Sequence, residues 1–330
     1  MAIINGSNKN DVIDEHDGVT NGDDSISSNG GNDLVFGLGG NDWFWQDTGA
    51  DTIYGGSGTD TVAYYYHASA SPGTEGVWVD LASGTGSRGA AAGDKYYSVE
   101  NVWGSIYADN ITGNDGDNEL HGWSGDDVLK GGGGADDLWG ESGNDTIKGG
   151  GGDDILDGGL GVDTLIGGTG NDFYYAKETD TLTENAGEGY DTVFTYATHY
   201  TLQDNVEELW LRSGVSATGN AQSNTIFGNV HDNVLNGGGG SDVLSGLGGN
   251  DTFVFRPGQA HGDTIYEFQG NGAGTGDMLR FEGYGSIAQG ATFRQLTSTE
   301  WEIGSADGVT KDIITLVGGP PVDASDFVFV

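Results

Sequence analysis

The hydrophobic pattern of the chain has a period of nine residues. Counted from Gly104, eight consecutive nonapeptides keep one register, and each carries a large apolar residue at its eighth place. These residues are Ile111, Leu120, Leu129, Leu138, Ile147, Leu156, Leu165 and Tyr174. The pattern predicts a short strand in each unit, with the eighth side chain pointing into a core that repeats along the chain.

The same frame occurs in two other places. Four units begin at Ser28, just after a degenerate unit that contains Asp24 and Ile26, and four more begin at Gly219. A disordered linker does not require a fixed apolar column, so this regularity favours a folded solenoid.

The polar places of the repeat predict a metal-binding turn. Glycine recurs at places one, two and four, where it permits positive φ and close backbone approach. The sixth place is an oxygen ligand, and carboxylate and carbonyl oxygens suit a hard cation that takes 6–8 oxygens at roughly 2.3–2.6 Å. The predicted metal ligands are Asp24, Asp33, Asp42, Asp51, Asp60, Asp109, Asn118, Asp127, Asp136, Asp145, Asp154, Asp163, Asp172, Asn233, Asp242 and Asp251.

The composition makes such a cation necessary. The chain has 51 Asp and Glu against 11 Lys and Arg, a formal net charge of -40, and 64 glycines. Without cysteine it has neither disulfides nor thiolate metal sites. A polyanion without a basic cluster is repelled by nucleic acid and anionic lipid, so neither is an expected partner.

The GGxGxDxUx unit, in which U is a large apolar residue, resembles the repeat of the RTX (hemolysin-type calcium-binding) family. The resemblance implies an all-β fold, a right-handed parallel β-roll or β-helix with two nonapeptides per coil. It also implies Ca²⁺ between each loop and the like loop one coil later, with ligand pairs such as Asp127 with Asp145, Asp136 with Asp154 and Asp145 with Asp163. The expected total is about 11 ions as an upper estimate.

Some units depart from this pattern. Asn118, Asn224 and Asn233 occupy the sixth place, and Tyr107, Gln222 and His231 replace the fourth glycine. All of these residues lie in the first two units of their blocks. We therefore expect weak or empty sites there.

The repeats divide the chain into six segments of one continuous solenoid. We expect an N-terminal block at 1–62, spacer coils at 63–103, a central block at 104–175, spacer coils at 176–218, a third block at 219–254, and a cap with a secretion signal at 255–330. The segment after Asp251 is similar to the C-terminal cap of serralysin-type secreted proteins. A cap closes the terminal coil against edge pairing.

The two ends favour type I secretion. The first residues have neither a cationic start followed by an apolar run nor a stretch long enough to cross a bilayer. The last residues, DASDFVFV, look like the uncleaved signal of type I substrates, although an ordinary last strand is the alternative. We expect a bacterial-type protein that is secreted, extracellular or at the cell surface, with a type I exporter as partner and no membrane insertion.

Enzymatic signatures are absent. No H-E-x-x-H metalloprotease motif and no G-x-S-x-G nucleophile elbow occurs in the sequence. We predict no catalytic residue and a non-enzymatic surface, matrix or polysaccharide-associated role; the alternative is a lyase- or epimerase-type enzyme acting on polysaccharide from a coil face. Aromatic residues at Trp43, Trp45, Trp139 and 64–67 could stack on sugars, but covering a neighbouring coil is the favoured reading.

Overall fold

The computed structural model describes residues 1–65, 75–270 and 276–330. The chain forms two compact units, residues Met1–Phe173 with Thr179–Thr183, and residues Tyr174–Glu178 with Glu184–Val330. Within the described ranges the regular structure consists of β-strands and two short 3-10 helices, η1 (Gly89–Ala91) and η2 (Ile287–Gln289). No helix of the described residues is long and apolar enough to cross a membrane.

The first unit contains two rows of strands. One row pairs in parallel in the order β1 (Ile3–Asn5), β3 (Ser25–Ser27), β5 (Trp43–Trp45), β7 (Thr61–Ala63), β11 (Asn101–Trp103), β13 (Glu119–His121), β15 (Asp137–Trp139) and β17 (Ile155–Asp157). The second row begins with β2 (Val12–Ile13), β4 (Leu34–Phe36), β6 (Thr52–Tyr54) and β10 (Lys95–Tyr97), all parallel. It continues with β8 (Trp78–Asp80), β12 (Asn110–Thr112), β14 (Val128–Gly133), β16 (Thr146–Gly151), β18 (Thr164–Thr169) and β20 (Thr181–Thr183), again parallel.

The first spacer adds an antiparallel excursion that the repeat pattern did not predict. Strand β9 (Thr85–Arg88) pairs antiparallel with both β8 and β10 and so joins the two parts of the second row. Strands β10 and β11 of the same spacer pair in parallel with β6 and β7. Residues 66–74, which include Tyr66 and His67 of the predicted aromatic group, lie outside the described part.

The second unit repeats the two-row plan. One row is β21 (Thr192–Thr195), β23 (Glu208–Leu211), β25 (Thr225–Asn229), β27 (Val243–Leu247), β29 (Thr264–Tyr266) and β33 (Lys311–Val317), all parallel, with β32 (Glu300–Gly304) and β31 (Thr292–Gln295) added antiparallel. The other is β22 (His199–Thr201), β24 (Ser216–Thr218), β26 (Val234–Asn236), β28 (Thr252–Phe255), β30 (Met278–Phe281) and β34 (Phe327–Phe329), all parallel. Strand β19 (Phe173–Ala176) crosses the unit boundary.

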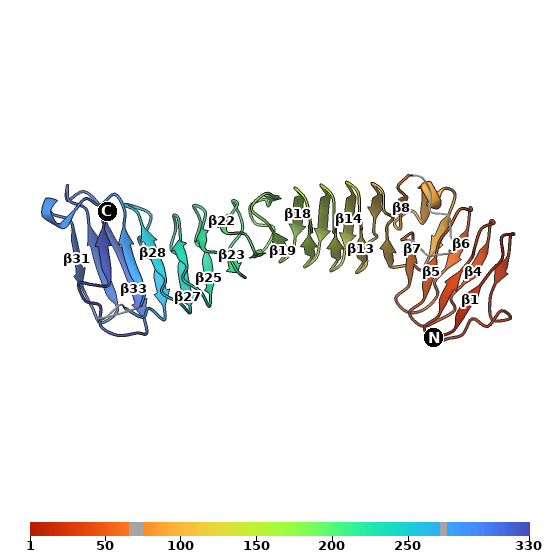
Figure 1. Ribbon diagram of the computed structural model, residues 1–330, viewed down its shortest axis with the longest axis horizontal. Helices are drawn as coiled ribbons and strands as arrows, with labels where there is room; N and C mark the ends of the chain where they lie inside the picture. Colours follow the sequence, from red (N-terminus) through yellow and green to blue (C-terminus); the bar gives the residue numbers. More distant parts are fainter. Residues whose placement is uncertain (66–74, 271–275) are drawn as a thin grey trace. The chain divides into compact units, whose positions relative to one another are not determined.

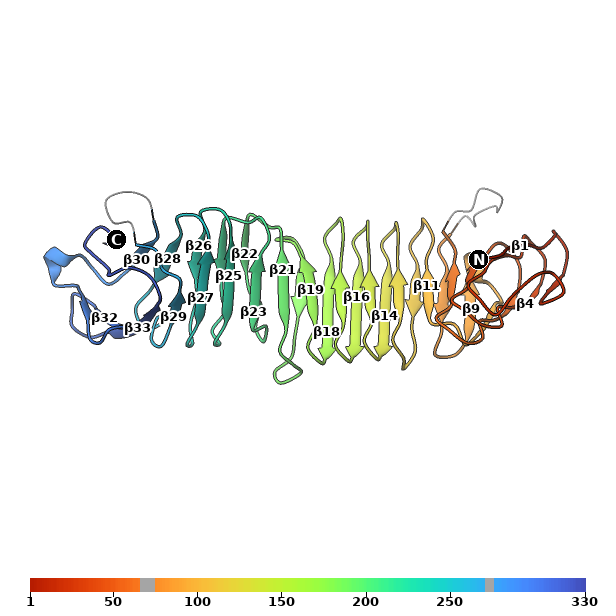
Figure 2. The same ribbon diagram turned by 90° about the horizontal axis from the view of Figure 1, so that it is seen from below.

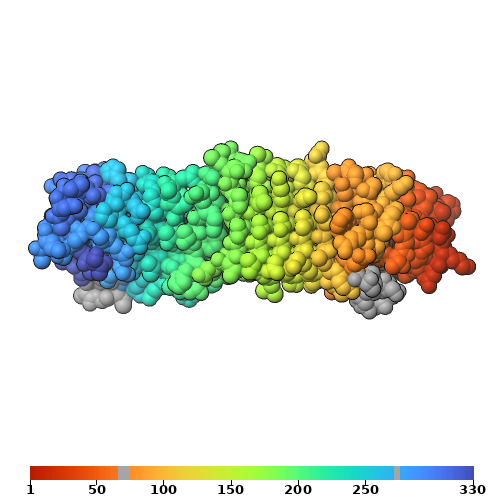
Figure 3. Space-filling model, turned by 90° about the horizontal axis from the view of Figure 1, so that it is seen from above, coloured from red at the N-terminus to blue at the C-terminus, as the bar shows by residue number. Residues whose placement is uncertain are grey.

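The strand register confirms the predicted parallel solenoid. Along the nonapeptides of the central block, partner residues are 18 apart, so one coil holds two nonapeptides: Ile111 pairs with Leu129, and Leu129 with Ile147. The eighth-place residues of the central block are fully buried. Figures 1 and 2 show β14, β16 and β18 side by side as successive coils, and the coils of this block pack directly on one another in Figure 3. The apolar column is therefore the core.

Candidate metal-binding column

The sixth-place side chains stack in columns along each unit. Where the second place of the loop has positive φ, one side-chain oxygen of the sixth-place residue accepts a hydrogen bond from the backbone N–H of the sixth-place residue one coil earlier. The Oδ1 atoms of Asp145, Asp154 and Asp163 accept from the N–H groups of Asp127, Asp136 and Asp145 at 2.8, 2.9 and 2.9 Å. The predicted pairs are therefore direct neighbours, and all sixteen predicted ligands are buried.

The second carboxylate oxygen, Oδ2, is buried without a hydrogen-bond partner in several of these residues. Among the described residues, a buried Oδ2 without a hydrogen-bond partner occurs at Asp33, Asp42, Asp60, Asp127, Asp136, Asp154 and Asp242. Each of the last four faces the first-place glycine of its own loop: a Cβ added at Gly131 or Gly149 would lie 2.1 or 2.2 Å from the Oδ2 of Asp136 or Asp154. Buried polar atoms without partners are costly, so these oxygens need a ligand.

The second place of these loops shapes the space around the oxygens. Gly132, Gly150 and Gly168 have φ of +120°, +123° and +111°. A Cβ at Gly150 would lie 2.2 Å from the carbonyl oxygen of Gly132, so loops one coil apart approach through their backbones. Carbonyl and carboxylate oxygens thus gather between like loops, which is the donor set of a hard cation such as Ca²⁺.

The electrostatics also point to a missing cation. Burial, followed by the neighbouring carboxylates, raises the pKa of Asp127 to about 8 and the pKa values of Asp42 and Asp154 to about 7, although a backbone hydrogen bond opposes each shift. Within the described ranges, no Lys, Arg or His forms an ion pair with these three residues. The residues of the column therefore fit calcium, whose charge would offset the repulsion.

A second kind of loop opens each block. In these loops the second place is Ser, Thr or Asn, and its backbone N–H donates to the sixth-place side chain of the same loop. The donor and acceptor pairs are Ser7 with Asp11, Thr20 with Asp24, Ser105 with Asp109, Asn114 with Asn118, Asn220 with Asn224, and Asn229 with Asn233. We call these closed loops, and the loops with positive φ at the second place open loops.

In the sixth-place asparagines of the closed loops, both the oxygen and the nitrogen of the side-chain amide form hydrogen bonds. The Nδ2 groups of Asn118, Asn224 and Asn233 donate to the carbonyl oxygens of Glu100, Val206 and Gly214 at 2.7, 3.0 and 3.0 Å. Four predicted ligands lie in closed loops, namely Asp24, Asp109, Asn118 and Asn233. Their oxygens already have backbone donors, which favours the prediction of weak sites.

The column also contains residues that the repeat pattern missed. The backbone N–H groups of Asp51, Asp60, Asp163, Asp242 and Asp251 donate to side chains in irregular coils, which are those of Asp94, Glu100, Asp180, Asp263 and Asp277. These five acceptors begin the sequences DKYY, ENVW, DTLT, DTIY and DMLR. Each of these sequences preserves the second half of the nonapeptide, in which an acidic residue stands two places before an apolar one. This spacing is the sequence signal that could have identified the five residues.

The predicted aromatic residues pack on other rings, most of which lie outside the predicted group. The ring of Trp43 lies 4.6 Å from that of Trp103 at an angle of 86° and 5.6 Å from that of Trp45. Trp139 stacks on the ring of His121 at 6.0 Å. These contacts favour the interpretation that the rings cover neighbouring coils.

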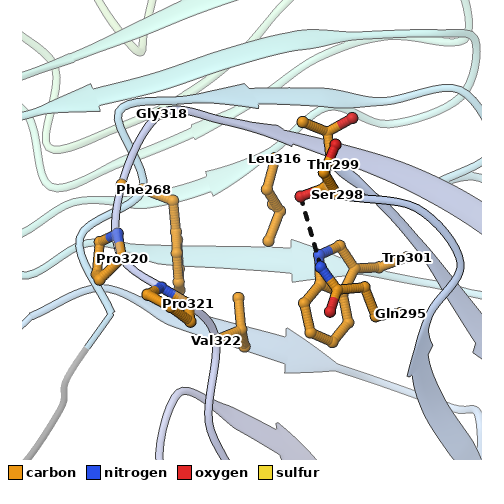
Figure 4. A pocket seen from close by; sticks show the side chains of 11 residues that line it. Phe268, Gln295, Ser298, Thr299, Trp301, Leu316, Gly318, Pro320, Pro321 and Val322 are labelled. Atoms are coloured by element: carbon orange, nitrogen blue, oxygen red, sulfur yellow. Dashed lines mark hydrogen bonds between the residues drawn. The ribbon is translucent and has the colours of Figure 1, made fainter.

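A cavity of about 220 Å³ lies in the second unit, among β32, β33 and the segment 318–322. Figure 4 shows Trp301, Phe268 and Leu316 beside it, with Gln295 donating to the carbonyl oxygen of Ser298. Among the described residues that line it, none has an ionisable side chain.

Comparison with known proteins identifies the repeats. A family model for the RTX calcium-binding nonapeptide repeat (4 copies) matches residues 19–45, 47–64, 103–138, 139–174 and 218–253. A solved structure, the extracellular lipase LipA from Serratia marcescens, is 17% identical with a TM-score of 0.24; the match covers 68% of this chain and 40% of that one. A search of curated proteins returns no match. Most of the open and closed loops described above lie within the matched ranges, and the chain contains RTX calcium-binding nonapeptide repeats that form a parallel β-solenoid.

Proposed function

We propose that this protein is exported unfolded and acquires its structure when calcium fills the open loops outside the cell. The ligands are the sixth-place carboxylates of the open loops together with backbone carbonyls of like loops one coil apart. The observation that carries the proposal is the row of buried Oδ2 atoms without partners, for example in Asp127, Asp136 and Asp154. Calcium supplies the charge that lets these carboxylates stack.

A calcium titration tests the proposal. In EGTA the full chain should be largely unfolded, because the stacked carboxylates repel one another. Far-UV circular dichroism should show cooperative gain of β-structure at roughly 10⁻⁴–10⁻³ M calcium, the range of extracellular modules. A β-spectrum that EGTA leaves unchanged contradicts calcium-dependent folding.

Export is a separate part of the proposal and needs its own test. The terminal residues form β34, which pairs with β30, and the rings of Phe327 and Phe329 lie 6.1 and 4.9 Å from that of Phe281. Deleting residues 326–330 should abolish secretion through a matching type I exporter. Phe293→Ala is the control, because Phe293 contacts the same ring of Phe281 at 4.9 Å but leaves the terminus intact. Equal loss in both variants would assign the defect to folding.

The biological role that follows is non-enzymatic binding at a cell surface or in an extracellular matrix. Incubation of the calcium-loaded protein with acidic polysaccharides should give calcium-dependent retention without new products. Time-dependent formation of unsaturated uronates or reducing ends would instead support the polysaccharide-acting enzyme.

A further inference from the structure

One loop of the first unit belongs to neither of the two loop types. The nonapeptide at 46–54 reads QDTGADTIY, so Gln46 and Asp47 replace the first two glycines. Asp47 does not have positive φ, unlike the second-place residues of the open loops. This loop also follows earlier coils of its block, whereas the closed loops open their blocks. The two replacements therefore call for their own physical explanation.

The side chains of both replacements are buried and incompletely satisfied. Asp47 and Gln46 are 5% and 7% exposed. Within the described part of the chain, Asp47 Oδ1 and Gln46 Oε1 have no hydrogen-bond partner. Burying an ionised carboxylate without a cation or a full set of donors is unfavourable. Some group must therefore complete these oxygens.

Asp47 faces a second carboxylate across one hydroxyl. Ser28 Oγ lies 3.5 Å from the Oδ2 of Asp47 and 3.5 Å from the Oδ2 of Asp51. A hydroxyl has a single hydrogen and can donate to only one of them. Asp47 Oδ2 also accepts from the N–H of Gly30 at 2.6 Å. The two carboxylates therefore approach the same small space without enough donors between them.

Two further carboxylates surround this pair. Asp94 Oδ1 accepts from the N–H of Asp51 at 2.9 Å, and its Oδ2 accepts from the hydroxyl of Tyr64 at 2.9 Å. Asp33 Oδ1 accepts from the N–H of Asp11, and its Oδ2 is buried without a partner in the described residues. Burial, and after it charges that include that of Asp47, raises the pKa values of Asp33, Asp51 and Asp94. No Lys, Arg or His of the described ranges forms an ion pair with any of the four.

We propose that Asp47, with Gln46 and Asp51, forms an additional divalent-cation site of the calcium type, outside the nonapeptide consensus. Gln46 contributes a neutral amide oxygen, and Asp51 contributes a carboxylate that also belongs to the column. Asp47 contributes a negative charge where the consensus repeat has glycine. Carboxylate and amide oxygens are both common calcium ligands, so the donor chemistry is suitable. The inference rests on the proposed calcium column only for the identity of the ion.

The test compares two Asp→Asn variants of the full chain. Asp47→Asn keeps the size of the side chain but removes its charge. The matched control is Asp23→Asn, since Asp23 is exposed in the same block and its Oδ1 accepts from the N–H of Asn41 at 2.9 Å. After equilibrium dialysis at saturating calcium, atomic emission should find about one ion fewer in Asp47→Asn and no loss in Asp23→Asn. An unchanged content in Asp47→Asn overturns the site.

A second measurement decides the matter if Asp47→Asn fails to fold in calcium. Crystals of the unaltered protein soaked in terbium should show an anomalous difference peak among Asp47, Gln46 and Asp51. Peaks in the open loops without one here overturn this inference and leave the proposed function standing. Failure of the proposed function would look different, because binding would be lost at every loop.

Discussion

The open loops and the closed loops use the same repeat but satisfy its sixth place in different ways. In the open loops of the central block, the Oδ2 of Asp127 or Asp154 has no hydrogen-bond partner in the described residues. In the closed loops of the third block, Asn224 and Asn233 direct an amide N–H₂ group to a carbonyl oxygen of the preceding coil. The amide hydrogens take the place that we propose for a cation in an open loop.

The difference follows from the neighbouring coil. An open loop lies against another glycine loop, which contributes carbonyl oxygens and close approach. The preceding coil of Asn224 is the irregular stretch around Val206, and it offers one backbone carbonyl instead. A carboxylate there would face that carbonyl without a donor, which explains the Asn at position 224, whereas the closed loops of Asp24 and Asp109 keep Asp.

Exchanging the two side chains should have the largest effect. Asp154→Asn removes a charge from an open loop and should raise the calcium midpoint of folding about tenfold, equivalent to about 1.4 kcal/mol. Asn224→Asp removes the donor to Val206 and should cost about 1–3 kcal/mol at any calcium concentration. Urea unfolding at several calcium concentrations separates the two. If Asn224→Asp instead gains calcium affinity, the distinction between open and closed loops is wrong.

Acid should substitute in part for calcium in the open loops. The folded pKa of Asp127 is about 8 and those of Asp42 and Asp154 about 7, against 3.8 for an unperturbed Asp. Raised values mean that the folded state binds protons more tightly. The contribution of these protonated carboxyl groups to the free energy of unfolding is therefore complete below about pH 3.8, and it is lost as the pH rises through about 7–8.

In EGTA, lowering the pH from about 9 to about 5 should therefore increase the β-signal in far-UV circular dichroism. With calcium present the effect reverses, because protons compete with the ion for the same oxygens. Asp127→Asn should shrink the acid-induced gain, whereas Asn224→Ala should leave it unchanged. A calcium-free spectrum that does not respond to pH would contradict the assignment of buried, uncompensated carboxylates.

The period of nine is sufficient to predict the core and most of the column. Leu129 and Asp127 follow from spacing alone, because one residue type recurs at one place of the coil. The continuation of the column into the spacer is harder to predict: Asp51 contacts Asp94 and Asp60 contacts Glu100 across 43 and 40 residues. Insertions of irregular length conceal the register there, and only the acidic residue two places before an apolar one remains.

The hydrogen bonds of the closed loops were also beyond the sequence pattern. The second place of these loops is Ser, Thr or Asn, yet Asn29 holds the second place of an open loop with φ of 63°, so the residue type alone does not tell whether its N–H turns toward the sixth place. Ser105 donates to Asp109 in this way, while Leu38, with φ of 72°, has the opposite backbone turn. That choice follows from the coil on which the loop packs, which the local sequence does not encode.

The smallest expected effect concerns the backbone of the open loops. Leu247 holds the second place of its loop with φ of 67° and is 45% exposed. Left-handed backbone costs an L-residue about 1–2 kcal/mol, and glycine avoids that cost while losing more entropy on folding. Leu247→Gly should therefore raise the free energy of unfolding in saturating calcium by about 0.5–1 kcal/mol.

The matched control is Val230→Gly, because Val230 is 76% exposed and has no positive φ. It should lower stability by about 0.5–1 kcal/mol. Urea unfolding measures both variants, and a loss of stability in Leu247→Gly similar to that of Val230→Gly would show that positive φ at the second place is not what defines an open loop.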